Sequence, residues 1–326
     1  MDGKYVDGSA WFYEPNKIAP IVFTVAFGIS TILHFWQCIK YSSFKITALH
    51  PFACVLFTVG FAMREVGAYH YKQTVPYIVS TILIYSAPPI LELANFHVLG
   101  RILYYVPYHA PLHPGRTLTT FGSLSFVVEV LNGLGIAWVA QPTVKENLHN
   151  VGHGLLKASL LLQLFVIVLF LGTSGTFHYR CARGGVLTRA TKFPLVTMYA
   201  SSLLVFVRCV YRTVEYFSSE SMYGAKSVDE LNALSPIVRY EWFFYVFEAS
   251  LMLLNEGLWN VMHPRRFLPR DYHVYLAKDG KTELQGPGWE DDRGFLMTMI
   301  DPLGCMDRGK KEAPFWETDG IGKPGN

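Results

Sequence analysis

Residues 193–216 read FPLVTMYASSLLVFVRCVYRTVEY, an apolar run that ends in three charged side chains. Residues 193–207 contain no Asp, Glu, Lys or Arg, which is typical of a helix that crosses a membrane. At about 100° per helical residue, Arg208, Arg212 and Glu215 lie within roughly 40° of one another and form one charged stripe. An unpaired charge in the last turns of a membrane helix costs a few kcal/mol, so a partner must face this stripe.

The next apolar run carries polar side chains at the same helical spacing, so it is the natural partner of the stripe. Five residues of that run are expected along one helix face: Glu241, Tyr245, Glu248, Met252 and Asn255. The two basic and three acidic side chains neutralise one another if the two faces meet. Two interpretations are open at this stage. The cluster is either a buried ion network that fixes helix register, or a polar cavity that binds a ligand.

The composition is that of a membrane protein. Of the 326 residues, 51% are hydrophobic and only 16% are charged, against about 25% charged in an ordinary soluble domain. The five cysteines show no paired spacing, which argues against a disulfide framework or a zinc knuckle. The sequence has no phosphate-binding G-x-x-x-x-G-K-[ST] loop, so direct ATP-driven pumping is not expected. We expect no cofactor, and partners that are the membrane and a lipophilic molecule but not nucleic acid.

Seven stretches are long and apolar enough to cross about 30 Å of hydrocarbon, which predicts an all-α integral membrane protein with a seven-transmembrane helix bundle. They are Ile18–Ile39, Ile46–Gly67, Val75–Arg101, Leu118–Val139, Ala158–Phe177, Phe193–Tyr216 and Ile237–Met262. The connections on one side carry more Lys and Arg, which places the N-terminus outside and the C-terminus in the cytosol. The predicted domains are an extracytoplasmic segment at 1–17, a transmembrane domain at 18–262 and a cytosolic, largely irregular tail at 263–326.

Two further spans contain residues that suggest a polar interior. Pro88-Pro89 is expected to break the third span and to bend it toward a cavity or a neighbouring helix, with Glu92 just beyond. In the fourth span, Glu129 and Asn132 are three residues apart. A glutamate in mid-span must be protonated, paired or facing water. Structural pairing and ligand contact are both open for this residue.

Other small or polar residues of the spans give weaker signals. Gly133 and Gly135 predict the close approach of a neighbouring helix or of a ligand. The fifth span is almost purely aliphatic apart from Gln163, so we expect this span to face lipid. Four histidines are scattered over separate spans and suggest no clear ligand set: His34, His50, His70 and His97. We therefore expect no metal site.

Three motifs of the last two spans stand out: Arg208-x3-Arg212-x2-Glu215-Tyr216, Glu241-x3-Tyr245-x2-Glu248 and Asn260-x2-His263-Pro264. Weaker signals precede them: His34, Glu65-x-Gly67, Ala87-Pro88 and Leu99-Gly100-Arg101. In this order, the motifs resemble the fungal RTA-like family of lipid-translocating exporters. The resemblance implies a seven-helix membrane protein that handles amphipathic lipids or toxic hydrophobic small molecules. Glu92 and Glu129 depart from the family pattern and add carboxylates to the polar interior.

Three functions are consistent with these features. The preferred one is a translocator of lipids or hydrophobic small molecules, such as a sphingoid base or a toxic metabolite. Its charged interior passes the polar head group while the tail stays in lipid. The second is a membrane-embedded cyclase or isomerase with Glu129 or Glu92 as general acid. The third is a seven-helix receptor or regulator.

The head group is left open by the sequence. Arginines suit a phosphate or carboxylate, whereas the glutamates suit an amine. The predicted substrate-binding residues are Arg208, Arg212, Glu215, Glu241, Tyr245, Glu248, Glu129, Asn132, Glu92 and Asn255. The expected location is the plasma membrane or an endomembrane.

Overall fold

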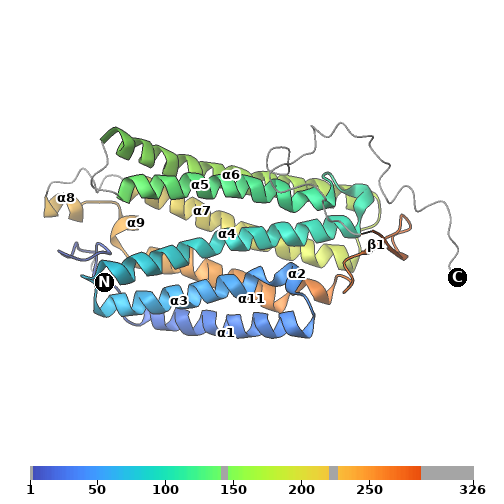
Figure 1. The fold of residues 1–326 in the computed structure, drawn as a ribbon, viewed down its shortest axis with the longest axis horizontal. Helices are drawn as coiled ribbons and strands as arrows, with labels where there is room; N and C mark the ends of the chain where they lie inside the picture. The colour runs from blue at the N-terminus through green and yellow to red at the C-terminus, as the bar shows by residue number, and fades with distance from the viewer. Residues whose placement is uncertain (1–2, 141–145, 220–226, 288–326) are drawn as a thin grey trace.

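The computed structural model describes residues 3–140, 146–219 and 227–287, which form a bundle of long helices lying side by side (Figure 1). The long helices are α1 (Ala19–Lys40), α3 (Leu49–Tyr69), α4 (Thr74–Tyr105), α5 (Pro114–Ala140), α6 (Glu146–Arg183) and α7 (Arg189–Ser219). The shorter elements are α2 (Phe44–Thr47), η1 (Pro107–His109), α8 (Val228–Asn232), α9 (Pro236–Arg239), α10 (Trp242–Phe244), η3 (Tyr245–Ser250), α11 (Leu251–Val261), η4 (Pro264–Arg266), β1 (Val274–Leu276) and β2 (Glu283–Gln285).

The six long helices are each long and apolar enough to cross a membrane. Many of their large apolar side chains point away from the bundle; Ile32 of α1, for example, is 69% exposed. Such an apolar exterior suits lipid as the surrounding medium. The chain is therefore an all-α, multi-pass membrane protein, as the sequence predicts.

The seventh predicted span, Ile237–Met262, is not one regular α-helix. It is divided among α9, α10, the π-helical segment η3 and α11. Glu241 lies before the first residue of α10, and Glu248 lies inside the π-helical turn. The prediction that Glu241, Tyr245 and Glu248 share one helix face at a uniform 100° per residue is therefore wrong.

Helix α4 continues through its two consecutive prolines. The sequence predicts a break at Pro88-Pro89, but the helix runs without interruption from Thr74 to Tyr105. Each proline removes one backbone hydrogen bond, and membrane helices tolerate this loss when neighbouring elements surround the freed carbonyl groups. Pro88 is indeed buried in the bundle.

Two hydrophobic clusters hold the bundle together. One contains stacked aromatic rings of α1 and α3, with the centroids of Phe27 and Phe57 4.5 Å apart. The other joins α4, α5 and α6 through Phe96, Phe121 and Phe170, whose ring centroids lie 5.0–5.3 Å apart. Such ring pairs contribute about 0.5–1.5 kcal/mol each beyond the area they bury. Helix α4 contributes buried residues to both clusters.

The first part of the tail is ordered, where the sequence predicts a largely irregular segment. Strands β1 and β2 pair antiparallel, with Tyr275 opposite Leu284. The buried Arg101 of α4 donates hydrogen bonds to the carbonyl oxygens of Asp271 (2.9 Å) and Val274 (3.2 Å), so the hairpin is docked on the end of α4. The predicted tail at 288–326 lies outside the described residues.

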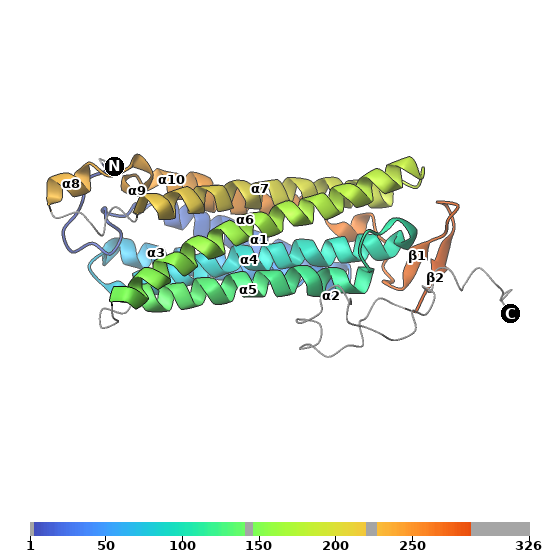
Figure 2. The same cartoon turned by 90° about the horizontal axis from the view of Figure 1, so that it is seen from above.

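The N-terminal segment and the hairpin lie at opposite ends of the bundle (Figures 1 and 2). Helices α8 and α9 lie at the same end as the N-terminal segment, and α2 lies nearer the hairpin end. All the long helices run between these two ends.

Candidate functional site

A polar cleft of about 150 Å³ lies among α4, α5, α6 and α7. Its apolar lining includes Val128, Ile136, Leu156 and Leu160. Its polar lining comes from all four helices: Tyr85, Glu129, Asn132, Ser159, Gln163, Arg208, Arg212 and Tyr216. Four of the predicted site residues, Glu129, Asn132, Arg208 and Arg212, are thus brought together in one cleft.

Arg208 and Glu248 form a buried ion pair between α7 and the last helical segment. The Arg208 Nε donates to Glu248 Oε1 at 2.8 Å, and the two side chains are 5% and 0% exposed. Glu248 occupies the π-helical turn η3. Such turns are frequent at functional sites because the extra residue changes the direction in which side chains point.

Arg212 is held by two other groups at the edge of the same cleft. Its guanidinium donates to the Tyr85 hydroxyl at 2.8 Å and lies 3.9 Å from the centre of the Tyr85 ring. It also pairs with Glu215 one turn along α7. The stripe predicted from the sequence is therefore present on α7, but Glu215 faces its own arginine and not the last helix.

Two carboxylates near this network are not neutralised. Glu129 is half-buried in the cleft, and Glu92 is 4% exposed and lines a small adjoining cavity with Asn95 and Ser202. Neither glutamate forms an ion pair with any residue that the structure describes. The Oε1 atom of Glu92 accepts no hydrogen bond from the residues that the structure describes. Because Arg208 and Arg212 are paired with Glu248 and Glu215, Glu129 is the charged residue of the cleft lining that is left without an ion-pair partner among the described residues.

Glu241 and Tyr245 belong to a second network away from the cleft. Glu241 Oε1 accepts from Arg64 of α3 at 2.8 Å and from the Tyr245 hydroxyl at 3.0 Å. The prediction that Glu241 neutralises the α7 stripe is wrong, because Glu241 forms its ion pair with Arg64. Arg64 is also 3.3 Å from the Tyr13 hydroxyl. Burial raises the pKa of the Tyr13 phenol, so this hydroxyl stays protonated.

The remaining predicted residue, Asn255, is fully buried outside the cleft lining. Neither its amide nitrogen nor its amide oxygen is hydrogen-bonded within the described ranges. Met252, predicted on the same face, packs in the hydrophobic cluster of α1 and α3.

Sequence reasoning missed three residues of these networks. Gln163 is only 7% exposed and lines the cleft, although the span that carries it is predicted to face lipid. A lone amide in an aliphatic helix is the signal that indicates burial. Arg64 carries the same kind of signal as a charge within a span, whereas nothing in the spacing of Tyr85 indicates its contact with Arg212.

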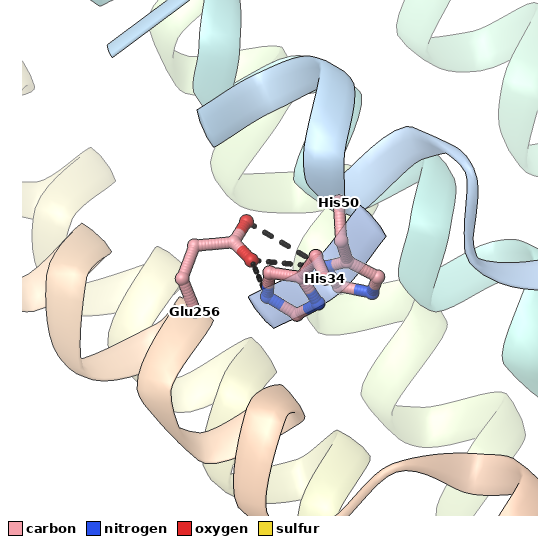
Figure 3. A group of neighbouring side chains, drawn as sticks. All are labelled: His34, His50 and Glu256. Carbon is pink, nitrogen blue, oxygen red and sulfur yellow. Dashed lines mark hydrogen bonds and ion pairs between the residues drawn. The ribbon is translucent and has the colours of Figure 1, made fainter. Parts of the chain in front are cut away.

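A third polar cluster gathers His34 of α1, His50 of α3 and Glu256 of α11 (Figure 3). Glu256 Oε2 lies 2.7 Å from His34 Nε2 and 3.3 Å from His50 Nδ1, and all three side chains are at most 2% exposed. His34 and His50 lie on separate helices, as predicted, but the fold brings their ring centroids to 5.2 Å from each other. One ligand atom from each residue lies within 4.8 Å of the others, a spacing that a metal ion could bridge.

Comparison with known proteins identifies relatives over most of the chain. A protein of Leptosphaeria maculans named lipid-translocating exporter-like protein RTA1 is 47% identical over 317 residues, which cover 94% of this chain. A protein of the same name from Ajellomyces capsulatus is 30% identical over 254 residues, covering 72% of this chain and 74% of that protein. Protoporphyrin uptake protein 1 of Saccharomyces cerevisiae is 25% identical over 287 residues, which cover 75% of this chain and 88% of that protein.

This chain spans 61% of the length of the Leptosphaeria protein. No solved structure matches this chain. The sequence profile of the family described as RTA1 like protein matches residues 51–271, which include the cleft, both ion networks and the tail residue Asp271. The chain belongs to the RTA1-like family.

Proposed function

We propose that this protein is a membrane translocator of amphipathic lipids or hydrophobic small molecules, and that the cleft among α4–α7 takes up the polar head group. The observation that carries the proposal is a charged cleft inside a bundle of apolar helices. Ionisable groups at membrane depth are costly, and they mark substrate or ion pathways. Arg208, Arg212, Glu129 and Asn132 are the residues we assign to head-group binding.

The head group that fits this cleft best carries a positive charge. Arg208 is already paired with Glu248, and Arg212 with Glu215 and Tyr85. Glu129 lines the cleft without such a partner in the part of the chain that the structure describes. A protonated amine donates hydrogen bonds to a carboxylate and neutralises it. We therefore assign Glu129 as the group that selects an amine.

The size of the cleft supports head-group binding with the tail left outside. A volume of about 150 Å³ is below the roughly 300–1,000 Å³ of pockets that enclose a whole drug-sized ligand. Helix α5, which carries Glu129, lies at the outside of the bundle: only 11% of the residues in its most apolar stretch are buried. Ile136, which also lines the cleft, is 53% exposed on the outer surface of α5. A hydrocarbon tail bound here remains in contact with lipid.

The names of the relatives support a translocator. Two are named lipid-translocating exporter-like proteins and one a protoporphyrin uptake protein, so transport of amphipathic molecules recurs among them. We further propose seven membrane crossings, with the segment Trp242–Val261 as the seventh, residues 1–17 outside and residues 263–326 in the cytosol. The placement of the N-terminal segment and the hairpin at opposite ends of the bundle supports an odd number of crossings.

The test uses the full chain reconstituted in liposomes. The probe is a single-chain amino alcohol with a fluorescent tail, compared with its N-acetylated analogue and with a carboxylate bearing the same tail. Loss of a charge-assisted hydrogen bond costs about 1.5–3 kcal/mol, so Glu129→Gln should slow amine movement roughly 10–100-fold. The matched control Glu146→Gln removes an exposed carboxylate at the start of α6 and should change nothing.

Three outcomes would count against the proposal. Movement of the amine no faster than in protein-free liposomes would contradict translocation of this class. Equal movement of the amine and its N-acetylated analogue would show that charge is not recognised. Selective movement of the carboxylate would assign the head group to the arginines instead of Glu129.

A further inference from the structure

We propose that His34, His50 and Glu256 form a binding site for a divalent first-row transition metal ion of the Zn²⁺ type. The ligand atoms are His34 Nε2, His50 Nδ1 and the carboxylate of Glu256. They come from α1, α3 and α11, so the bound ion would join three helices that are distant in sequence (Figure 3). This site is separate from the cleft, whose lining contains none of the three residues.

The donor set matches what such ions prefer. Imidazole and carboxylate are common zinc ligands, with metal–ligand distances of about 2.0–2.2 Å. Two ligands at a tetrahedral centre are then ~3.3 Å apart. His50 Nδ1 and Glu256 Oε2 lie 3.3 Å apart, and His50 Nδ1 and Glu256 Oε1 3.5 Å apart. The His34–Glu256 pair, at 2.7 Å, must open by about 0.6 Å.

Hydrogen bonding alone leaves the cluster incompletely satisfied. His34 Nε2 and Glu256 Oε2 are close, yet the pair has the distance of a hydrogen bond without its angles. Both imidazole rings direct a nitrogen toward the same carboxylate oxygen, Glu256 Oε2. A metal ion would accept lone pairs from all three groups at once.

Two further buried atoms are suited to a metal-bound water. Gln37 is three residues from His34 on α1, and Asn260 is four residues from Glu256 on α11, so each lies on the helix face of a ligand. Both side chains are at most 9% exposed, and both amide nitrogens donate, Gln37 to the Asn260 carbonyl and Asn260 to Ser30. Their amide oxygens accept no hydrogen bond from the described residues. A water that completes the metal's coordination would donate to them.

The experiment measures metal bound to the full-length protein, purified in detergent with an affinity tag that contains no histidine. After equilibration with Zn²⁺ and removal of free metal, elemental analysis should give about one zinc per chain. His34→Gln, His50→Gln and Glu256→Gln should each reduce the bound zinc at least tenfold. His70→Gln is the matched control, because His70 is an exposed histidine at the end of α3 outside the cluster.

If the variants do not yield folded protein, a measurement on the wild-type protein alone still tests the proposal. X-ray absorption of zinc in the wild-type protein should then show two imidazole ligands. Wild-type protein that binds no zinc would overturn the proposal and leave the cluster as a buried histidine–glutamate ion pair. Zinc retained in the three variants, or a zinc spectrum without imidazole, would place the metal elsewhere and overturn it equally.

Discussion

The ion pair between Arg208 and Glu248 predicts a specific pattern of stability in single and double variants. The two side chains are 5% and 0% exposed and 2.8 Å apart, so neither charge has water to replace its partner. Removing one member of such a pair costs about 3–5 kcal/mol, because the other charge stays buried alone. We therefore expect Glu248→Leu and Arg208→Met each to lower the free energy of unfolding by about that amount.

The double variant distinguishes an uncompensated charge from a lost contact. With both charges replaced by apolar side chains of similar size, the desolvation cost disappears along with the attraction. We expect Arg208→Met/Glu248→Leu to lie within about 1 kcal/mol of the wild type, far from the sum of the single changes. Denaturant unfolding in mixed micelles, followed by circular dichroism, measures all four proteins.

An exposed pair provides the control for this cycle. Glu14 and Lys17 are 3.6 Å apart, with side chains 59% and 47% exposed, so Glu14→Gln should change stability by less than about 1 kcal/mol. Single variants of Arg208 or Glu248 as stable as this control would refute the reasoning. So would a double variant that loses the full sum. If the double variant is stable but no longer transports the amine probe, the pair serves the cleft as well as the fold.

Three further predictions concern packing, the tail and pH. A Cβ atom on Gly135 would meet Leu156 Cγ at 2.7 Å and the Gly152 carbonyl oxygen at 3.0 Å. Gly135→Ala should therefore lower the free energy of unfolding by about 1–3 kcal/mol in the same assay. Gly133 faces open space, so Gly133→Ala should leave the free energy of unfolding unchanged or raise it by up to about 1 kcal/mol. A lysine at position 101 cannot donate hydrogen bonds to both the Asp271 and Val274 carbonyl oxygens as the guanidinium does. Limited proteolysis should therefore cleave the β1–β2 hairpin faster in Arg101→Lys than in the control Arg183→Lys, which changes an exposed arginine. Hydrogen bonds from Thr282 and Lys281 lower the pKa of Asp279 to about 2, below its unfolded value of about 3.9, so the turn should be fully formed above about pH 4 and lost as the pH falls toward 2. Hydrogen exchange at the Thr282 amide measures the turn. If the Asp279→Asn variant protected this amide as well as the wild type does at every pH, the prediction would be contradicted.

The membrane fold is predictable because the length of an apolar run is a local property of the sequence. Each of the six long helices overlaps a predicted span, and α4 runs unbroken through Pro88-Pro89 because neighbouring elements in the bundle make proline tolerable inside a membrane helix. The seventh segment could not be read in the same way. Its π-helical turn inserts an extra residue into one turn, and a periodicity of 3.6 residues does not predict such an insertion.

The site was predictable in part. Helical spacing correctly places Arg208 and Arg212 along one face of α7, and both reach the cleft with Glu129 and Asn132. Pairing between helices depends on which spans are neighbours, and the spacing within a span carries no such information. For this reason Glu241 was matched with the wrong arginine, and the cluster of His34, His50 and Glu256 was not foreseen.

The two hydrophobic clusters have a mechanical consequence through α4. This helix packs Ile84, Ala87 and Leu91 into one cluster and its residues from Phe96 onward into the other, and α6, α7 and α11 also contribute residues to both clusters. Pro88-Pro89 lies between Ala87 and Leu91, within the stretch that packs in the first cluster, and removes two backbone hydrogen bonds there, which lowers the bending stiffness of α4. We therefore expect bending of α4 to be concentrated at these prolines. Pro89 also lines the cleft, so such bending would change the width of the cleft.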